Sequence, residues 1–315
     1  MKVVHLYSGG LDSTIVIEIL KSWGAKVYPL HVTHKFLSIK HLPEIPGLKI
    51  LDATKEFIEV VKSPPHGYGK NFNPCIDCRI MMLKKAKEYM VELKADFVTT
   101  GEVLDQRPMS QRLDTMMRIE REAGLEGLVV RPLSGRLLPT TIPEQKGVID
   151  RDKLLIVKGR SRKFALDFAA KHDLKDYFSP SGGCLLTDPG FSRRLADAMR
   201  YQDDLKEDAV ERLKIGRHFR IAPDGKLIVG RNEEENLKLE KLAGPFFFLF
   251  VPDIGSPNTI LEGAKKHLKL AAAVTARYSD RHQEKNVEVH YRQKKKTGKI
   301  VVDPIPDDEL ARWRI

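Results

Sequence analysis

The turn "SGGLDS" at residues 8–13 constrains the fold of this chain more than any other feature of its sequence. An apolar run of β-forming residues precedes it at 3–7, and residues 14–23 follow with apolar side chains at helical spacing. A glycine-rich turn between a strand and a helix lets the backbone approach a ligand and points amide groups at it. We therefore expect a parallel α/β sheet with an anion bound above this turn.

Strand-like and helix-like runs alternate over the first two thirds of the chain. Strands are expected at 3–7, 26–32, 48–52, 96–100 and 154–157, and helices at 14–23, 54–62, 79–93, 106–122 and 161–171. This alternation predicts βαβ units around a parallel sheet, with ligands at the carboxyl ends of the strands. The segment "TTGEVLDQ" also follows a strand directly, so Gly101 is expected at the same edge as the turn.

The pattern changes near residues 200–216, where a charged helix leads into a different arrangement of elements. The turn "PDG" separates two β-rich runs, as in a hairpin. A helix is expected at about 259–279, followed by the strand "NVEVHYRQ". These elements predict a smaller α+β domain at 209–315, after a larger domain at 1–208.

The charge of the chain favours a polyanionic partner. The net charge of the 315 residues is +11, and residues 209–315 carry +6 of it. Within 265–299 there are 11 basic residues against 3 acidic ones, which favours nucleic acid. No apolar run reaches the roughly 18 residues of a membrane span, and no leader precedes the first strand. We therefore expect a cytoplasmic protein without a membrane partner.

The turn at 8–13 is not a Walker loop, because no lysine follows its second glycine. It resembles the S-G-G-x-D-S signature of the PP-loop ATP pyrophosphatases, whose fold is of the adenine nucleotide alpha hydrolase type. The resemblance implies that MgATP binds here and is cleaved between its α and β phosphates. By residue type, the glycines admit phosphate, the hydroxyls donate hydrogen bonds and the carboxylate holds Mg²⁺. The expected ATP-binding residues are Ser8, Gly9, Gly10, Asp12, Ser13 and Gly101, with Asp12 also catalytic.

Three further segments resemble tRNA-thiolating members of that family. "NPCIDCR" at 73–79 resembles the tRNA 2-thiouridylases, while "TGEVLDQRPMSQ" at 100–111 and "VVRPLSG" at 129–135 resemble the tRNA 4-thiouridine synthetases. Asp105 departs from the latter pattern, in which glycine is usual. The resemblance implies that ATP adenylates a uridine carbonyl oxygen and that sulfur then replaces it, giving 2-thio- or 4-thiouridine. The implied partners are tRNA and a sulfur donor, either sulfide or a persulfide carrier.

The count of three cysteines argues against a disulfide framework and for ligand, catalytic or buried roles, and the resemblance to thiolating enzymes implies that they are catalytic. Cys75 and Cys78 begin a predicted helix, whose dipole favours thiolates, and Cys184 follows a flexible "SGG" turn. Together they resemble the ligands of cluster-dependent thiolases, and a [4Fe–4S] cluster is the favoured prediction. One alternative is a persulfide on Cys184 with a partner in the C-x-x-C pair. The other is zinc, which needs a fourth ligand such as His66.

The C-terminal part resembles the NFACT RNA-binding domain, through "HFRIAPDGKLIVGRNEEENLKL" at 218–239 and the order of the later elements. RNA contacts are expected from Arg231, Asn232, Lys294, Lys295 and Lys296. Four arginines on the expected helix at 106–122 either meet RNA or form a solvated face: Arg107, Arg112, Arg118 and Arg121. His31 and His34 follow the second strand and receive no chemical role.

Two functions other than sulfur transfer stay open at this point. An amine-transferring PP-loop tRNA ligase would use the same turn but has no need of three cysteines. An RNA-binding factor with a regulatory or vestigial ATP site would need only the C-terminal domain.

Overall fold

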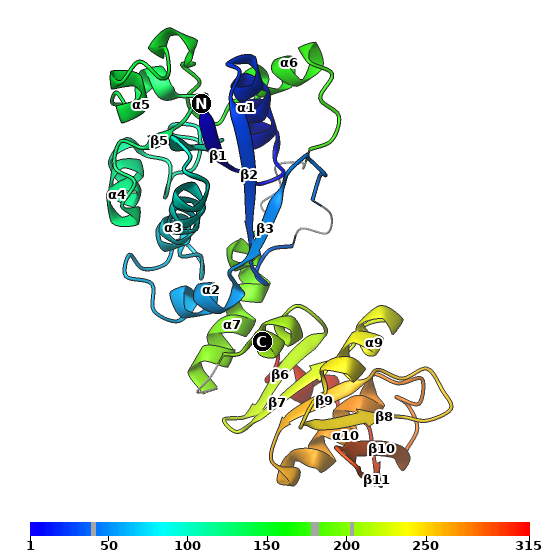
Figure 1. The fold of residues 1–315 in the computed structure, drawn as a ribbon. Coiled ribbons are helices and arrows are strands. Elements are labelled where there is room, and N and C mark those ends of the chain that lie inside the picture. Colours follow the sequence, from blue (N-terminus) through cyan, green and yellow to red (C-terminus); the bar gives the residue numbers. More distant parts are fainter. Residues whose placement is uncertain (39–41, 178–182, 202–204) are drawn as a thin grey trace. The chain divides into compact units, whose positions relative to one another are not determined.

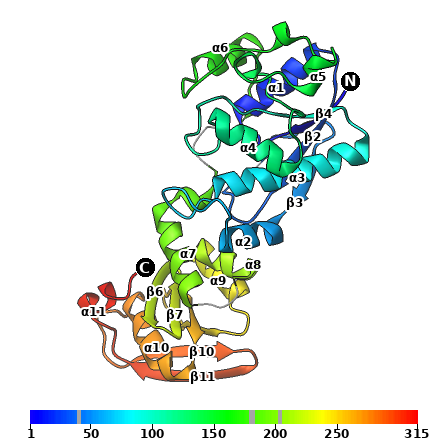
Figure 2. The same cartoon turned by 90° about the vertical axis from the view of Figure 1, so that its left-hand side faces the viewer.

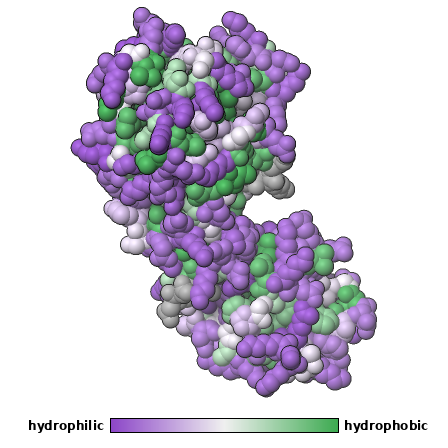
Figure 3. Space-filling model, in the orientation of Figure 1, coloured by the Kyte–Doolittle hydropathy of each residue, from purple (hydrophilic) through white to green (hydrophobic). Residues whose placement is uncertain are grey.

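The computed structural model describes residues 1–38, 42–177, 183–201 and 205–315. It divides into two compact units, Met1–Thr187 and Asp188–Ile315, here called the N-terminal and C-terminal units (Figure 1). On the face in Figure 3, hydrophilic residues cover most of both units, with hydrophobic ones in small groups between them. Among the described residues, no helix is both long enough and apolar enough to cross a membrane.

The N-terminal unit contains a five-stranded parallel sheet in the order β3-β2-β1-β4-β5, which confirms the predicted α/β class. Its strands are β1 (Lys2–Leu6), β2 (Lys26–Thr33), β3 (Lys49–Asp52), β4 (Phe97–Thr100) and β5 (Val129–Val130). Strand β1 is the central strand and pairs with β2 on one side and β4 on the other, so the strand order reverses at β1. Ligands of such sheets bind at the carboxyl ends of the strands, at this switch point.

Helices cover both faces of this sheet (Figure 2). They are α1 (Leu11–Ser22), α2 (Thr54–Lys62), α3 (Cys75–Leu93), α4 (Leu113–Ala123), α5 (Ile142–Gln145) and α6 (Lys163–Lys171). Helices α1 and α6 share a buried cluster that includes Ile15, Ile19, Ala165 and Ala169. Helices α3 and α4 lie on the opposite face of the sheet (Figure 2).

Three predicted elements of the N-terminal unit differ from the structure. Residues 154–157 form no strand, because Leu155 and Val157 donate only to the loop carbonyls of Pro132 and Leu133, each at 2.8 Å. The helix expected at 106–122 begins only at Leu113, since turns held by backbone hydrogen bonds occupy 105–111. Helix α3 begins four residues earlier than expected, after Pro74, so its first turn includes both cysteines of the C-x-x-C pair.

The C-terminal unit is built on a six-stranded antiparallel sheet in the order β11-β10-β8-β9-β7-β6. Its strands are β6 (Arg217–Ala222), β7 (Gly225–Val229), β8 (Phe247–Phe250), β9 (Thr259–Gly263), β10 (Val287–Gln293) and β11 (Lys296–Val302). Its helices are α7 (Pro189–Tyr201), α8 (Glu207–Leu213), α9 (Glu233–Leu242), α10 (Leu268–Arg277) and α11 (Asp307–Ala311). The predicted hairpin is confirmed as β6 and β7, and so is the smaller α+β domain.

The helix expected at 259–279 was predicted too long. Its first part is strand β9, which pairs with both β7 and β8, and only Leu268–Arg277 is α-helical. The first four residues of "TILEG" are buried, and its β-branched Thr259 and Ile260 suit a strand in the middle of a sheet. Helix α10 then packs its alanines against the core of this sheet.

Buried ion pairs explain why the structural boundary lies at 187/188, 21 residues before the predicted 208/209. Asp197 on α7 accepts from Arg220 on β6 at 2.6 Å, and Arg212 on α8 pairs with Glu262 on β9. Arg220, Lys226 and Glu262 are direct cross-strand neighbours, so these charges form one row across three strands. Helices α7 and α8 are therefore tied to the antiparallel sheet and belong to the C-terminal unit.

Candidate functional site

The turn after β1 has the conformation that the sequence predicts for a phosphate cradle. Gly9 has a φ of 76°, in the left-handed region that favours glycine, and extended Gly10 precedes the first turn of α1. The Ser13 hydroxyl donates to the Gly10 carbonyl at 2.8 Å and lies 3.0 Å from the Ser8 hydroxyl. The two serines therefore fix the turn at the end of the helix where the backbone amides are open to an anion.

Gly101 and His5 pack against this turn and contact Ser13. A Cβ atom on Gly101 would lie 2.7 Å from the backbone nitrogen of Ser13, so only glycine fits where the end of β4 meets α1. Buried His5 contacts the Ser13 carbonyl through Nε2 at 3.0 Å and the Thr99 hydroxyl through Nδ1 at 2.9 Å. Burial lowers the pKa of His5 to about 4, so the ring is neutral, with Nε2 donating to the carbonyl and Nδ1 accepting.

A cavity of about 550 Å³ opens above the turn. Of the predicted ATP-binding residues, Ser8, Gly10, Asp12, Ser13 and Gly101 line it. Asp12 accepts a hydrogen bond from Gln106 Nε2 at 2.9 Å, across the cavity from the loop after β4. The predicted meeting of the two strand-end segments is therefore present in the structure.

An ion network that sequence reasoning missed forms one wall of this cavity. Arg79 on α3 lines the cavity, and its Nε lies 3.4 Å from Glu102 Oε1. Buried Arg131 donates from Nε to Glu102 Oε2 at 3.0 Å and also pairs with Glu120. Burial alone would raise the pKa of Glu102, but Arg131 and Arg79 outweigh it and hold that pKa below its usual range. The carboxylate is therefore ionised and fixes Arg79 in place.

Three further arginines line the cavity: Arg107, Arg160 and Arg162. Arg107 is exposed in the loop before α4 rather than on the predicted helix, and Arg112 is at the N-cap of α4. Arg118 and Arg121 are exposed on α4 and do not line the cavity. No local sequence signal joins residue 107 to residues 160–162, because their proximity depends on the tertiary fold.

The three cysteines lie near one another in the N-terminal unit. Cys75 and Cys78 occupy the first turn of α3, and Cys184 forms an antiparallel bridge with Leu37. Electrostatic interactions link Cys78 with both other thiols and Cys184 with Cys75, so the three side chains are near one another. Burial raises the pKa of Cys78 to about 12 and that of Cys184 to about 11, although both residues keep some exposure. The predicted convergence of these residues is thus present.

Asn73, just before α3, donates from Nδ2 to Cys75 Sγ at 3.2 Å. The same nitrogen lies 3.8 Å from Met109 Sδ, in the loop whose Arg107, Pro108 and Gln111 line the cavity. That loop therefore borders both the cavity and the cysteines. Asn73 is part of the quoted "NPCIDC" segment but received no role there.

The predicted iron–sulfur cluster agrees with the type of ligand present, but the arrangement of the described residues does not show a metal site. Three thiols are suitable ligands for an iron–sulfur cluster. Among the described residues, however, no three His, Cys, Asp or Glu side chains are grouped so that they could hold a metal ion. His66 is not available as a zinc ligand, since Asp77 and Glu122 occupy its ring nitrogens at 2.8 and 3.1 Å. The hydrogen bond to Asp77 raises the pKa of His66.

His31 lies on β2 and His34 directly follows this strand. His31 Nδ1 lies 2.9 Å from the Tyr7 carbonyl in a buried position. Burial lowers the pKa of His31. The ring of His34 stacks on Phe57 with centroids 3.8 Å apart.

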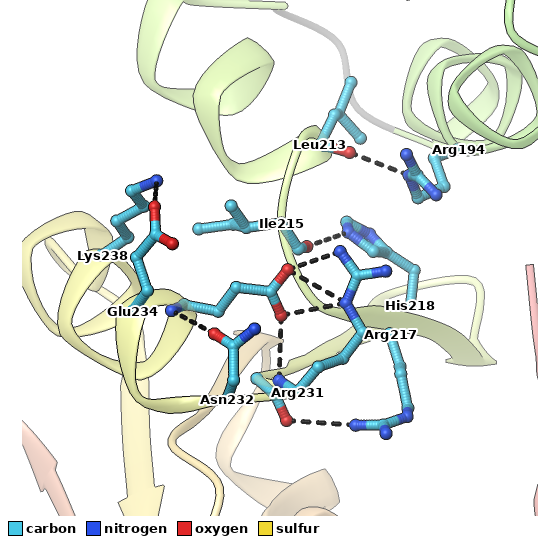
Figure 4. A network of polar contacts seen from close by, with 11 residues as sticks. Arg194, Leu213, Ile215, Arg217, His218, Arg231, Asn232, Glu234 and Lys238 are labelled. Atoms are coloured by element: carbon cyan, nitrogen blue, oxygen red, sulfur yellow. Dashed lines mark hydrogen bonds and ion pairs between the residues drawn. The ribbon is translucent and has the colours of Figure 1, made fainter.

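Two of the predicted RNA-contact residues hold the start of α9 in the C-terminal unit (Figure 4). Asn232 is the N-cap, and its Oδ1 accepts from the Glu235 amide at 2.9 Å. Arg231 pairs with the Glu235 carboxylate through its guanidinium, yet half of its side chain stays exposed. The three predicted lysines lie at the tip of the β10–β11 hairpin and are exposed, with Lys294 at a φ of 53°.

Further cations surround Arg231 in the same unit. Arg194 on α7 donates to the Leu213 carbonyl at 2.8 Å, and Arg217 on β6 donates to the Gly230 carbonyl at 3.2 Å (Figure 4). Burial lowers the pKa of Arg194, with smaller contributions in the same direction from Arg231 and Arg193. These arginines were not predicted, because only Arg231 lies in the quoted motif.

Comparisons with known proteins found one matching family model and one similar curated protein. Residues 216–314 match the family described as NFACT protein RNA binding domain. A segment of 149 residues is 28% identical to a protein named "Probable tRNA sulfurtransferase" from Thermococcus kodakarensis. That alignment covers 42% of this chain and 37% of the relative, so the chain spans little more than a third of the relative's length.

Two solved structures show weaker likeness. A 4-thiouridine synthetase in complex with RNA and bound ATP is 22% identical, with a TM-score of 0.37 over 63% of this chain and 50% of that one. The C-terminal part of a fibronectin/fibrinogen-binding protein from Streptococcus suis is 11% identical, with a TM-score of 0.29 over 76% of this chain and 96% of that one. TM-scores this low support no conclusion about function. Residues 216–314 thus match an RNA-binding domain family, and a further segment of the chain is similar to part of a tRNA sulfurtransferase.

Proposed function

We propose that this protein is an ATP-dependent tRNA uridine sulfurtransferase. One observation carries the proposal: helix α3 begins with Cys75 and Cys78 and, one residue later, sends Arg79 into the cavity above the "SGGLDS" turn. A sulfur site and a nucleotide site therefore share one helix. An amine-transferring ligase would use the cavity but leave the three converging thiols without a purpose.

In this proposal the cavity binds ATP with Mg²⁺. Gly9 and Gly10 let the triphosphate approach the backbone at the start of α1, and the hydroxyls of Ser8 and Ser13 border it. Asp12 would hold Mg²⁺, a role suited to a carboxylate that already faces the cavity. The target uridine carbonyl oxygen attacks the α-phosphorus, and the bond to the departing pyrophosphate breaks. Arg79, fixed by Glu102, is placed to stabilise the charge that develops on the phosphates.

Sulfur then attacks the activated carbon, a C–S bond forms, and the C–O bond breaks as AMP leaves. We propose that Cys75, Cys78 and Cys184 supply that sulfur. If Cys184 carries it as a persulfide, a thiolate of the C-x-x-C pair attacks Cys184 Sγ and releases the thiolated base. The resulting disulfide must be reduced by an external thiol. A [4Fe–4S] cluster held by the same three residues stays a prediction.

The C-terminal unit would bind the tRNA. The hairpin lysines Lys294, Lys295 and Lys296 are exposed and suited to phosphate contacts. Arg231 keeps an exposed half beside its ion pair with Glu235, so it can reach an RNA phosphate without unfolding the cap. Asn232 uses its carbonyl oxygen in the cap and retains its amide group for an RNA acceptor.

A second candidate is an RNA-binding factor in which the ATP site does no chemistry. The family match to residues 216–314 favours it, because that match alone accounts for RNA binding. It differs from the first candidate in predicting no pyrophosphate release and no change in the RNA.

The test is to incubate the anaerobically purified protein with ATP, Mg²⁺ and unmodified tRNA transcript, in parallel with sulfide and with a persulfide donor plus an external thiol. Pyrophosphate release and thiouridine, detected by mass spectrometry of the digested RNA, are expected together. The triple variant Cys75→Ala, Cys78→Ala, Cys184→Ala should release pyrophosphate but yield no thiouridine, whereas Asp12→Asn should do neither. Iron and acid-labile sulfide near four per chain, lost in the triple variant, would decide for the cluster. RNA binding with no pyrophosphate release at all would favour the second candidate.

A further inference from the structure

The cavity above the "SGGLDS" turn has more positive charge than its own carboxylates neutralise. Of its four arginines, Arg79 pairs with Glu102. Within the part of the chain that the structure describes, Arg107, Arg160 and Arg162 have no carboxylate partner. Uncompensated guanidinium groups that face one cavity form a site for an anion, and their planar donor pattern suits phosphate.

The fold brings these three arginines together from two distant segments. Leu104 and Lys158 form a parallel bridge, and the Gly159 amide donates to the Leu104 carbonyl at 2.7 Å. An ion pair between Lys158 Nζ and Asp105 Oδ2, at 3.3 Å, joins the same segments. Asp105 has a φ of 60°, so the chain turns sharply here and continues to Arg107. Backbone contacts thus join the two segments that bring these arginines to the cavity.

Most of the turn at 8–13 is less exposed than these side chains. Arg107 and Arg160 are exposed and Arg162 is half-buried. In the turn, Gly9, Leu11 and Ser13 are buried, Gly10 and Asp12 are half-buried, and Ser8 is exposed. The arginines therefore lie where the cavity meets solvent. A long polyanion that enters from solvent meets this rim first, while a small nucleotide can reach the turn behind it.

We infer that Arg107, Arg160 and Arg162 bind the RNA backbone phosphates beside the uridine that is modified. This inference rests on the proposed function, which requires ATP and a polynucleotide in the same cavity. The turn and Arg79 then bind the triphosphate, and the rim arginines bind the phosphates of the RNA. The target base is thereby directed toward the α-phosphorus.

The experiment compares the double variant Arg160→Ala, Arg162→Ala with the matched control Arg136→Ala, Lys153→Ala. The control removes two exposed cations of the same unit that do not line the cavity. Affinity for unfractionated tRNA is measured by filter binding between low and moderate salt, and affinity for ATP without RNA by equilibrium dialysis. Both variants should melt at the wild-type temperature, because each removes only side chains without carboxylate partners among the described residues.

The double variant should bind tRNA at least about tenfold more weakly than the control does. The slope of log affinity against log salt should become shallower by about 1.5, as two phosphate contacts are lost. ATP affinity should stay within twofold of the wild type. A tenfold loss of ATP affinity, or tRNA binding equal to that of the control, would overturn the inference. If the wild type binds ATP but no tRNA, the proposed function itself is contradicted. If the wild type binds tRNA and the double variant binds it as well as the control does, only the inference about the three arginines is contradicted.

Discussion

The Arg79 guanidinium lies 3.4 Å from the Glu102 carboxylate, measured from Nε to Oε1, in the wall of the candidate ATP cavity. Glu102 is also bound by buried Arg131, so a single carboxylate joins helix α3 to the segment after β5. A buried charge that loses its partner is strongly destabilising, whereas an exposed pair contributes little. The position of Arg79 and the stability of the N-terminal unit should therefore depend on the same residue.

The variant Glu102→Gln keeps the shape of the side chain but removes its charge. We expect the free energy of unfolding of the N-terminal unit to fall by about 2 kcal/mol, because buried Arg131 loses one of its two carboxylate partners and keeps only Glu120. Urea unfolding in a Trp313→Phe background measures this, since Trp23, packed against the α1–α6 core, is then the reporter. The control Asp105→Asn breaks the exposed pair with Lys158 and should cost less than about 1 kcal/mol. Equal losses in both variants would contradict this role of Glu102.

Buried His5 should make the stability of the N-terminal unit depend on pH. Its pKa is about 4 in the folded protein, below the value of about 6.5 in an unfolded chain. Between these values the unfolded state binds more protons, so stability rises as pH increases from 4 to 6.5 and then levels off. The contribution of this one residue is on the order of 3 kcal/mol.

The variant His5→Gln tests this dependence, because its amide can still donate to the Ser13 carbonyl but does not titrate. In the Trp313→Phe background, its unfolding free energy should be lower at pH 7 and should change less between pH 4 and 6.5 than that of the parent. Other buried histidines contribute equally to both proteins and cancel in the difference. Parallel pH curves for the two proteins would show that His5 does not titrate as described.

The three thiols should differ in reactivity when no cluster is bound. Cys75 accepts a hydrogen bond from Asn73 at its sulfur and is the first residue of α3. Cys78 and Cys184 have pKa values of about 12 and 11 and stay protonated at pH 8. Iodoacetamide at pH 8 should therefore alkylate Cys75 at least about tenfold faster than the other two.

Peptide mass spectrometry of iron-free protein, sampled over time, measures this order of alkylation. The variant Asn73→Ala should slow the reaction of Cys75 and leave the other two rates unchanged. Faster alkylation of Cys184 than of Cys75 would instead favour Cys184 as the nucleophilic residue. The result also bears on the persulfide alternative, which assigns the transferred sulfur to Cys184.

The sequence predicted best what depends on short segments. The glycines of the turn and the C-x-x-C pair are short local patterns, and the structure places Gly9 in a left-handed turn and both cysteines in the first turn of α3. Arg79 and Glu102 could not be predicted as a pair, because they lie on different elements and meet only when α3 packs on the sheet. Apolar content misled at 154–157, where the chain donates to a loop and not to a strand.

The boundary between the units was missed for a related reason. Helices α7 and α8 read as charged surface helices, but Asp197 and Arg212 on them pair with buried charges on the antiparallel sheet. A charge pattern in sequence does not show which partner neutralises it. Helix α9 was not predicted either, although an asparagine followed three residues later by glutamate is a recognisable start of a helix.

Asn232 has a structural role in this cap and a proposed role in RNA binding, and two substitutions separate them. Asn232→Ala removes the cap and should lower the unfolding free energy of the C-terminal unit by about 1 kcal/mol. Asn232→Asp keeps an oxygen that accepts from the Glu235 amide, so stability should be retained. Trp313, packed against the core of this unit, reports its unfolding in a Trp23→Phe background.

The aspartate in Asn232→Asp, however, places a negative charge where RNA phosphates would approach. We expect Asn232→Asp to bind tRNA several-fold more weakly than the wild type at low salt, with the difference shrinking as salt is added. Unchanged tRNA affinity in a stable Asn232→Asp protein would leave Asn232 with the cap alone and assign RNA contact to Arg231 and the hairpin lysines.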